Sequence, residues 1–188
     1  MGKLATIICF VITFLLLGGI AVLIAWLADK MKSPMFSIDQ ANINGYNFTA
    51  DNHLNATFIL EVRSHNRDSK YQIKYDLIVV SVYHSGYTLA YDSNLGPFTQ
   101  HHGEDIVFTA QPRARNVLIR NSELAGDIRN EARAEKLGLE VHVRAAVRYE
   151  VARWKHKSYV LRIICTPVFV GLSSGKGSQS TICDVDRF

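Results

Sequence analysis

The residues from Leu139 to Val151 read LEVHVRAAVRYEV. Apolar side chains stand at the odd positions, and five of the six even positions between them are polar or charged. Successive side chains of a β-strand point to opposite faces of a sheet, so this period of two predicts a strand with one buried and one solvated face. The domain around this stretch is therefore expected to be built on β-sheet.

The same alternation occurs upstream, between Leu54 and Val62, where Asn55 falls on the solvated side. His84-Ser85-Gly86 is typical of a hairpin turn between two strands. Further strands are expected at 36–43, 71–83, 87–91, 106–110 and 159–170. About seven short strands separated by turn signals favour a two-sheet antiparallel sandwich.

One segment, residues 123–136, has helical periodicity, with Asn121 or Ser122 as its N-cap and Leu124, Ile128 and Ala132 on one face. A single short helix among so many strands argues against a parallel α/β sheet, in which helices and strands alternate. The predicted fold class is therefore mainly β, with an antiparallel sandwich and one short helix.

The N-terminal segment differs from the rest, because the residues from Leu4 to Ala28 carry no charge and include fifteen Leu, Ile, Val or Phe. A bilayer core of ~30 Å needs about 20 helical residues, and this stretch would span about 37 Å. We therefore expect a single transmembrane helix, with residues 1–30 as the anchor and 31–188 as the β domain. A cleaved signal peptide would have an apolar stretch of only ~7–15 residues.

The side of the membrane that the β domain faces is suggested by two features, since the charges flanking the apolar stretch are nearly balanced. Asn47-Phe-Thr and Asn55-Ala-Thr are acceptor sequons for N-glycosylation. Cys165 and Cys183 would close an ~18-residue loop worth ~3 kcal/mol if they form a disulfide in an oxidising compartment, whereas two free thiols are the alternative. Both features favour a cytoplasmic N-terminus and an extracellular domain.

The sequence motifs give little support for an enzymatic function. Gly171-Leu-Ser173-Ser-Gly175 fits a nucleophile-elbow pattern, but only 13 residues follow it and the last histidine lies upstream. The adjacent pair His101-His102 lacks partners at metal-ligand spacing. The net charge of +4 supports no nucleic-acid partner. We therefore expect no catalytic site, no cofactor and no metal.

Four basic residues near the strongest strand, Arg144, Arg148, Arg153 and Lys155, are a candidate basic patch. Such a patch would attract an acidic protein, anionic lipid or wall polysaccharide. The alternative is a solvated strand face whose charges serve solubility alone.

Several short motifs follow one another in a fixed order along the chain. They are Ser64-His-Asn66, Lys70-Tyr-Gln-Ile-Lys-Tyr75-Asp76, Val82-Tyr-His-Ser-Gly86-Tyr-Thr-Leu-Ala90, Pro97-Phe98-Thr-Gln100, and Trp154-Lys-His-Lys-Ser-Tyr159 before Cys165. In this order they resemble the late embryogenesis abundant group 2 (WHy-type) domain. With the N-terminal apolar segment, the whole chain resembles the plant harpin-induced, non-race-specific-disease-resistance-like membrane proteins. Ser64-His65-Asn66 departs from the Asn-Pro-Asn that this family often has at one turn.

The resemblance implies a fibronectin-III-like sandwich, residence at the plasma membrane, and a role in defence or stress responses without catalytic residues. Our first hypothesis is a non-enzymatic membrane glycoprotein that acts in plant defence signalling, with unknown protein partners bound by its extracellular domain. The alternative is a stress-protective protein, or a binder of lipid or cell wall that uses the basic patch.

Overall fold

A computed structural model describes residues 2–28, 31–151, 155–172 and 180–188, and within these ranges it leaves out the side chains at 3–6, 24–28, 93–94, 151 and 155–156. The chain forms two compact units, Met1–Lys32 and Ser33–Phe188. Each unit is described by itself.

The first unit contains one helix, α1 (Gly2–Ala28). All its described side chains from Ile7 to Leu23 are exposed, and they include large apolar ones such as Phe10, Phe14 and Leu15. Among the described residues, none of the helices combines the length and the apolarity that a membrane crossing requires. The predicted helix over this segment is therefore present, and its transmembrane role is not confirmed.

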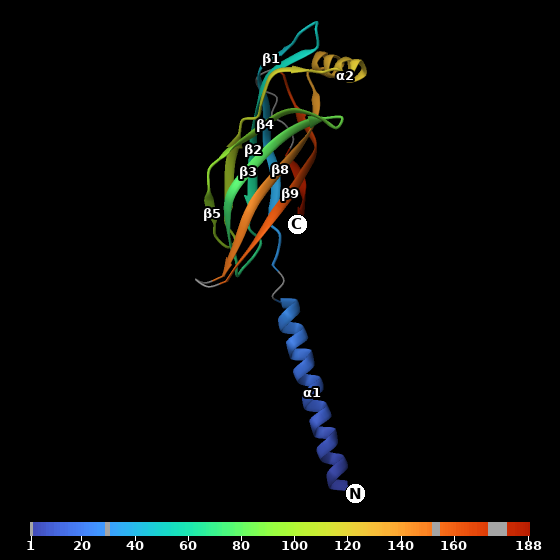
Figure 1. Ribbon diagram of the computed structural model, residues 1–188, viewed down its shortest axis with the longest axis vertical. Coiled ribbons are helices and arrows are strands. Elements are labelled where there is room, and N and C mark those ends of the chain that lie inside the picture. Colours follow the sequence, from blue (N-terminus) through green and yellow to red (C-terminus); the bar gives the residue numbers. More distant parts are fainter. Residues whose placement is uncertain (1, 29–30, 152–154, 173–179) are drawn as a thin grey trace. The chain divides into compact units, whose positions relative to one another are not determined.

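The second unit is mainly β, as predicted, and its strands run beside one another with a short helix at one end (Figure 1). In chain order its elements are β1 (Met35–Phe48), β2 (His53–His65), β3 (Gln72–His84), β4 (Tyr87–Leu95), β5 (Phe98–Gln100), β6 (Asp105–Ala110), β7 (Arg113–Leu118), α2 (Ser122–Arg133), β8 (Leu137–Val151), β9 (Lys155–Val170) and β10 (Thr181–Arg187).

The pairings between these strands are antiparallel, in the order β1-β10-β9-β8-β3-β4-β7-β2-β6, with β5 beside β3. An additional pairing of β1 with β2 joins the first strand of this order to the last but one. The contact between β4 and β7 is the weakest step, because it has a single register pair, Tyr91↔Arg113. The arrangement is consistent with a β-sandwich.

The core follows the period of two in the sequence. In β8 the odd-numbered side chains from Leu139 to Tyr149 are at most 2% exposed, and in β2 Leu54, Phe58 and Leu60 are at most 1% exposed. Full burial of one such side chain contributes about 1.5–3 kcal/mol, which is why the alternation predicted these strands. The side chain of Val151, expected on the same buried face, lies outside the described residues.

The hairpin turn and the helix N-cap are of the types that the sequence predicted. Ser85 and Gly86 both have positive φ, 46° and 81°, as a two-residue hairpin loop between β3 and β4 requires. The Asn121 side chain accepts hydrogen bonds from the backbone N–H groups of Glu123 and Leu124, so Asn121 is the N-cap of α2. The helix ends at Arg133, three residues before the predicted end, because Glu135 has a left-handed φ of 54°.

Three strands were not predicted: β5, β7 and β10. The first has only three residues. The other two, RARNVL and TICDVDR, bury only Ala114 and Cys183. Strands with so little buried surface lack the apolar alternation that reveals a strand in sequence.

Candidate functional site

A cluster of buried polar side chains joins β2, β3 and β5. The Ser64 hydroxyl lies 3.0 Å from the Tyr75 hydroxyl and donates to Gln100 Oε1 at 3.1 Å, and Tyr75 also donates to that oxygen at 3.0 Å. Gln100 Nε2 donates to the backbone carbonyls of Ser64 at 2.7 Å and Glu104 at 2.8 Å. All three side chains are fully buried. The cluster therefore cross-links three strands from inside the unit.

The chemistry of this cluster is structural. Burial raises the pKa of Tyr75 well above its ordinary value, so its hydroxyl stays protonated at physiological pH and acts as a hydrogen-bonding group. Burial likewise raises the pKa of Tyr149, to about 12. Every described side-chain hydrogen bond of Gln100 joins it to Ser64, Tyr75 or Glu104. Three of the quoted motifs thus contribute residues that hold the fold.

The loop after β2 is held in the same way. Asn66 Nδ2 donates to the carbonyls of Tyr71 at 2.9 Å and His101 at 3.0 Å, and Asn66 Oδ1 accepts from the Asp68 N–H at 3.0 Å. Asp68 Oδ1 in turn accepts from the N–H groups of Lys70 and Tyr71. The turn with the departing Ser64-His65-Asn66 motif is therefore closed by side chain–backbone hydrogen bonds.

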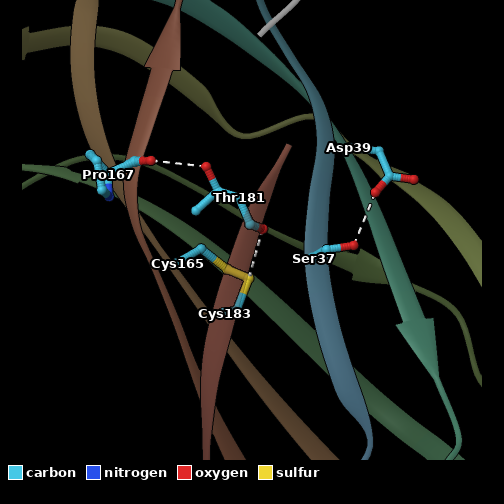
Figure 2. The surroundings of a disulfide bond; sticks show 6 residues. All are labelled: Ser37, Asp39, Cys165, Pro167, Thr181 and Cys183. Carbon is cyan, nitrogen blue, oxygen red and sulfur yellow. Dashed lines mark hydrogen bonds between the residues drawn. A yellow bond between two sulfur atoms is a disulfide. The ribbon is translucent and has the colours of Figure 1, made fainter. Parts of the chain in front are cut away.

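A disulfide joins Cys165 of β9 to Cys183 of β10, with an S–S distance of 2.04 Å and a Cα–Cα distance of 4.2 Å (Figure 2). Cys183 also pairs in register with Phe36 of β1, and the Thr181 hydroxyl donates to the Pro167 carbonyl at 2.9 Å. The disulfide therefore fastens β10, a strand with few buried side chains, between β9 and β1. The structure therefore contains a disulfide at these two positions and not the alternative of two free thiols.

The two predicted glycosylation sequons lie opposite each other. Asn47 is exposed on β1, and its register partner on β2 is Asn55, which is partly exposed. The side-chain oxygen of Asn55 accepts a hydrogen bond from the Asn116 N–H at 2.8 Å. Glycosylation at either position stays a prediction.

The predicted basic patch is only partly within the described side chains. Arg144 is exposed on β8, whereas Arg148 forms two hydrogen bonds with Asp76 of β3, at 2.8 and 2.5 Å. These hydrogen bonds hold the pKa of Asp76 below its ordinary value. Arg153 and the side chain of Lys155 lie outside the described residues. The patch of four stays a prediction, and one of its members, Arg148, forms an ion pair with Asp76.

The histidine pair and the Gly/Ser-rich pattern lie in different parts of the chain. His101 and His102 are exposed on the turn after β5. Within the ranges that the structure covers, no group of three His, Cys, Asp or Glu side chains could hold a metal ion. Ser173 and Gly175 of the Gly/Ser-rich pattern fall outside the described residues.

A cleft that sequence reasoning missed opens between β4 and the β6–β7 segment, with a volume of about 760 Å³. Its β7 side carries Arg113 and Arg115, both exposed, and Tyr91 on its β4 side is 69% exposed. The only sequence signal was the alternation of charge in Arg113-Ala-Arg115, which is too short to predict a strand.

Comparison with known proteins finds relatives along nearly the whole chain. NDR1/HIN1-like protein 10 of Arabidopsis thaliana is 25% identical over 94% of this chain and 80% of its own length. NDR1/HIN1-like protein 3 is 23% identical over 97% of this chain and 80% of its own, and NDR1/HIN1-like protein 12 is 26% identical over 90% and 80%. No model of a known protein family matches the chain.

Among solved structures, a protein from Archaeoglobus fulgidus aligns with 80% of this chain and 95% of its own, with 12% identity and a TM-score of 0.35. The sequence relatives are informative because they extend over both units. Several NDR1/HIN1-like proteins are homologues of this chain at about 25% identity over most of its length, and they support its assignment to the harpin-induced, NDR1-like family.

Proposed function

We propose that this chain is a non-enzymatic, single-pass membrane protein that acts in plant defence signalling through interactions of its extracellular β domain. The observation that carries the proposal is homology to the NDR1/HIN1-like proteins, which suggests a plant defence-related family. The buried polar side chains support a non-enzymatic role, because Gln100, Tyr75 and Ser64 satisfy one another and the backbone.

The membrane anchor is supported by the uncharged run from Leu4 to Ala28 and by the exposed apolar side chains along α1. Fifteen large apolar residues at roughly −0.3 kcal/mol each favour insertion by about 5 kcal/mol. Interactions are expected to be made by the β domain, which is the larger of the two units, Ser33–Phe188.

The extracellular placement of the β domain is supported by the Cys165–Cys183 disulfide. Structural disulfides persist in secreted and extracellular compartments and are rare in the cytosol, where thiols are kept reduced. The exposed Asn47 sequon is compatible with the same side of the membrane.

Replacing Leu16 and Ile20 with arginine is expected to abolish both membrane retention and the defence effect. Each arginine at a helix centre costs about 2.5–3.5 kcal/mol, so two of them outweigh the estimated driving force for insertion. The measurement is retention of the full chain in leaf membranes after alkaline carbonate washing, followed in the same leaves by growth of an inoculated bacterial pathogen.

The control is Leu16→Ala/Ile20→Ala, which keeps the helix uncharged and should behave as the unmodified chain does. Release of the unmodified chain by carbonate would contradict the anchor. Equal pathogen growth with and without the unmodified chain would contradict the role in defence.

One observation favours the alternative function, binding to anionic lipid or wall polysaccharide. Arg144 of β8 lies in register opposite Arg162 of β9, and both are exposed. Like charges directly opposite each other destabilise a sheet, so this pair suggests an anion-binding role. Under this alternative, Arg144→Glu/Arg162→Glu abolishes sedimentation of the full chain with anionic vesicles and with pectin. Unchanged sedimentation would remove its support.

A further inference from the structure

We propose that the cleft between β4 and β7 binds an extended acidic peptide, which adds to β4 as a further strand. The inference rests on the proposed function, because it identifies the partner class and the surface through which the β domain would act. The observations that carry it are the lining of the cleft, the open edge of β4 and the spacing of two arginines.

The lining shows which part of each strand borders the cleft. The β6–β7 segment contributes alternate residues, 109, 111, 113, 115 and 117, which is one outward face of a strand. By contrast, β4 contributes Leu95 and five consecutive residues, from Thr88 to Asp92. Consecutive side chains of a strand point to opposite faces, so all five can border one cleft only where the cleft meets the edge of β4. Backbone groups of β4 therefore border the cleft.

The edge of β4 that faces the cleft has no register pair with β7 at residues 88–90, before Tyr91 pairs with β7. On its other side β4 pairs with β3 along most of its length, from His84↔Tyr87 to Ile78↔Leu95. Towards β7, in the part of the chain that the structure describes, the only register pair is Tyr91↔Arg113. An open strand edge offers N–H and C=O groups to another chain, and many peptide-binding domains add a ligand strand in this way.

The charges in the cleft specify the ligand further. Arg113 and Arg115 are exposed and, among the described side chains, neither forms an ion pair or side-chain hydrogen bond that would neutralise it. The nearby carboxylate of Asp92 accepts the Gln111 N–H at 2.9 Å. Guanidinium groups bind carboxylates through two parallel hydrogen bonds. The cleft therefore has two guanidinium groups available to a carboxylate-bearing ligand.

The spacing of Arg113 and Arg115 along β7 matches the spacing of alternate side chains in an extended peptide. Residues two apart on a strand lie about 6.8 Å apart on the same face. Acidic side chains at alternate positions of a ligand strand have this same spacing. A uronate polysaccharide also carries carboxylates, but it has no backbone N–H groups to pair with β4. The cleft volume of about 760 Å³ falls in the range of about 300–1,000 Å³ found for ligand sites.

The binding test uses the full chain in detergent micelles and a fluorescent octapeptide of alternating Thr and Glu, with binding followed by fluorescence polarisation. We expect saturable binding that weakens at least about tenfold in Arg113→Glu/Arg115→Glu, because the variant removes the two guanidinium partners of the peptide's carboxylates and puts repelling carboxylates in their place. The charge-matched control is Arg144→Glu/Arg162→Glu on the outer face of β8 and β9, which should bind within about twofold of the unmodified chain.

Two further ligands test the strand geometry. A peptide of the same composition with its four Glu in one block should bind several-fold more weakly, because its carboxylates do not repeat at the spacing of the arginines. The alternating peptide can also be N-methylated at every second amide. Methylation of the amides that face β4 should abolish binding, whereas methylation of the amides that face away from β4 should leave binding unchanged.

The proposal is overturned if the alternating peptide fails to bind, if both arginine pairs affect binding equally, or if neither pattern of methylation matters. It is also overturned if oligogalacturonate binds at Arg113 and Arg115 while the peptide does not, since the site would then recognise acidic sugar. Loss of the cleft proposal in any of these ways leaves the carbonate and pathogen results unchanged, so the two failures are distinguishable.

Discussion

Replacing Gln100 with leucine is expected to lower the free energy of unfolding by about 3–5 kcal/mol. The substitution keeps a side chain of similar size but removes two donors and one acceptor from the buried cluster. The carbonyls of Ser64 and Glu104 and the hydroxyl of Tyr75 then lose partners in an environment without water. Thermal unfolding of the full chain in micelles, followed by circular dichroism of the β-sheet, measures the loss.

The matched control is Gln40→Leu, the same chemical change at an exposed position of β1, which should stay within about 0.5 kcal/mol of the unmodified chain. Tyr75→Phe should fall between them, at about 1–2 kcal/mol, because it removes only one hydroxyl of the same cluster. Equal stability of Gln100→Leu and Gln40→Leu would show that the cluster does not hold β5 against β2 and β3.

Removing the disulfide through Cys165→Ala/Cys183→Ala is expected to cost about 3 kcal/mol, the value for a loop of this length in the chain-entropy account. The sequence separation of the two cysteines is 18. The loss should be concentrated at β10, since this strand has little buried surface of its own to keep it in place. Hydrogen exchange resolved by residue should therefore show the earliest opening at β10.

Cys9→Ala is the control for this pair, because Cys9 is the free, exposed cysteine of α1. It should leave both the unfolding temperature and the exchange at β10 unchanged. Thiol titration of the denatured, unreduced protein should find one thiol, that of Cys9. Three reactive thiols, or uniform exchange across all strands after the double substitution, would contradict the disulfide's role.

The sequence predicted the parts of the fold whose side chains are sorted by burial. In β8 the apolar residues that alternate from Leu139 to Tyr149 are the ones whose side chains are buried. The polar strand β7 could not be found in this way, because it is held by pairing with β2 and β4 and its own side chains are mostly exposed. Such a strand is specified by its partner and not by its own pattern.

The candidate sites were less predictable for a related reason. Gln100 stands in the polar stretch Thr99-Gln-His-His-Gly103, which reads as a solvated turn. Its burial depends on β5 pairing with β3, a contact that cannot be read from neighbouring residues. The cleft depends on the separation of β4 from β7 beyond Tyr91↔Arg113, and separation between strands distant in sequence leaves no local signal.

The proposed function depends most on the β domain lying outside the cell, and one measurement tests this placement directly. The full chain is expressed in plant cells, treated with an endoglycosidase that removes N-linked glycans, and compared by electrophoretic mobility with Asn47→Gln/Asn55→Gln. We expect the unmodified chain to shift on treatment and the double variant to migrate already at the shifted position. A chain that carries no glycan in plant cells, and whose cysteines at 165 and 183 are reduced there, would contradict the extracellular placement.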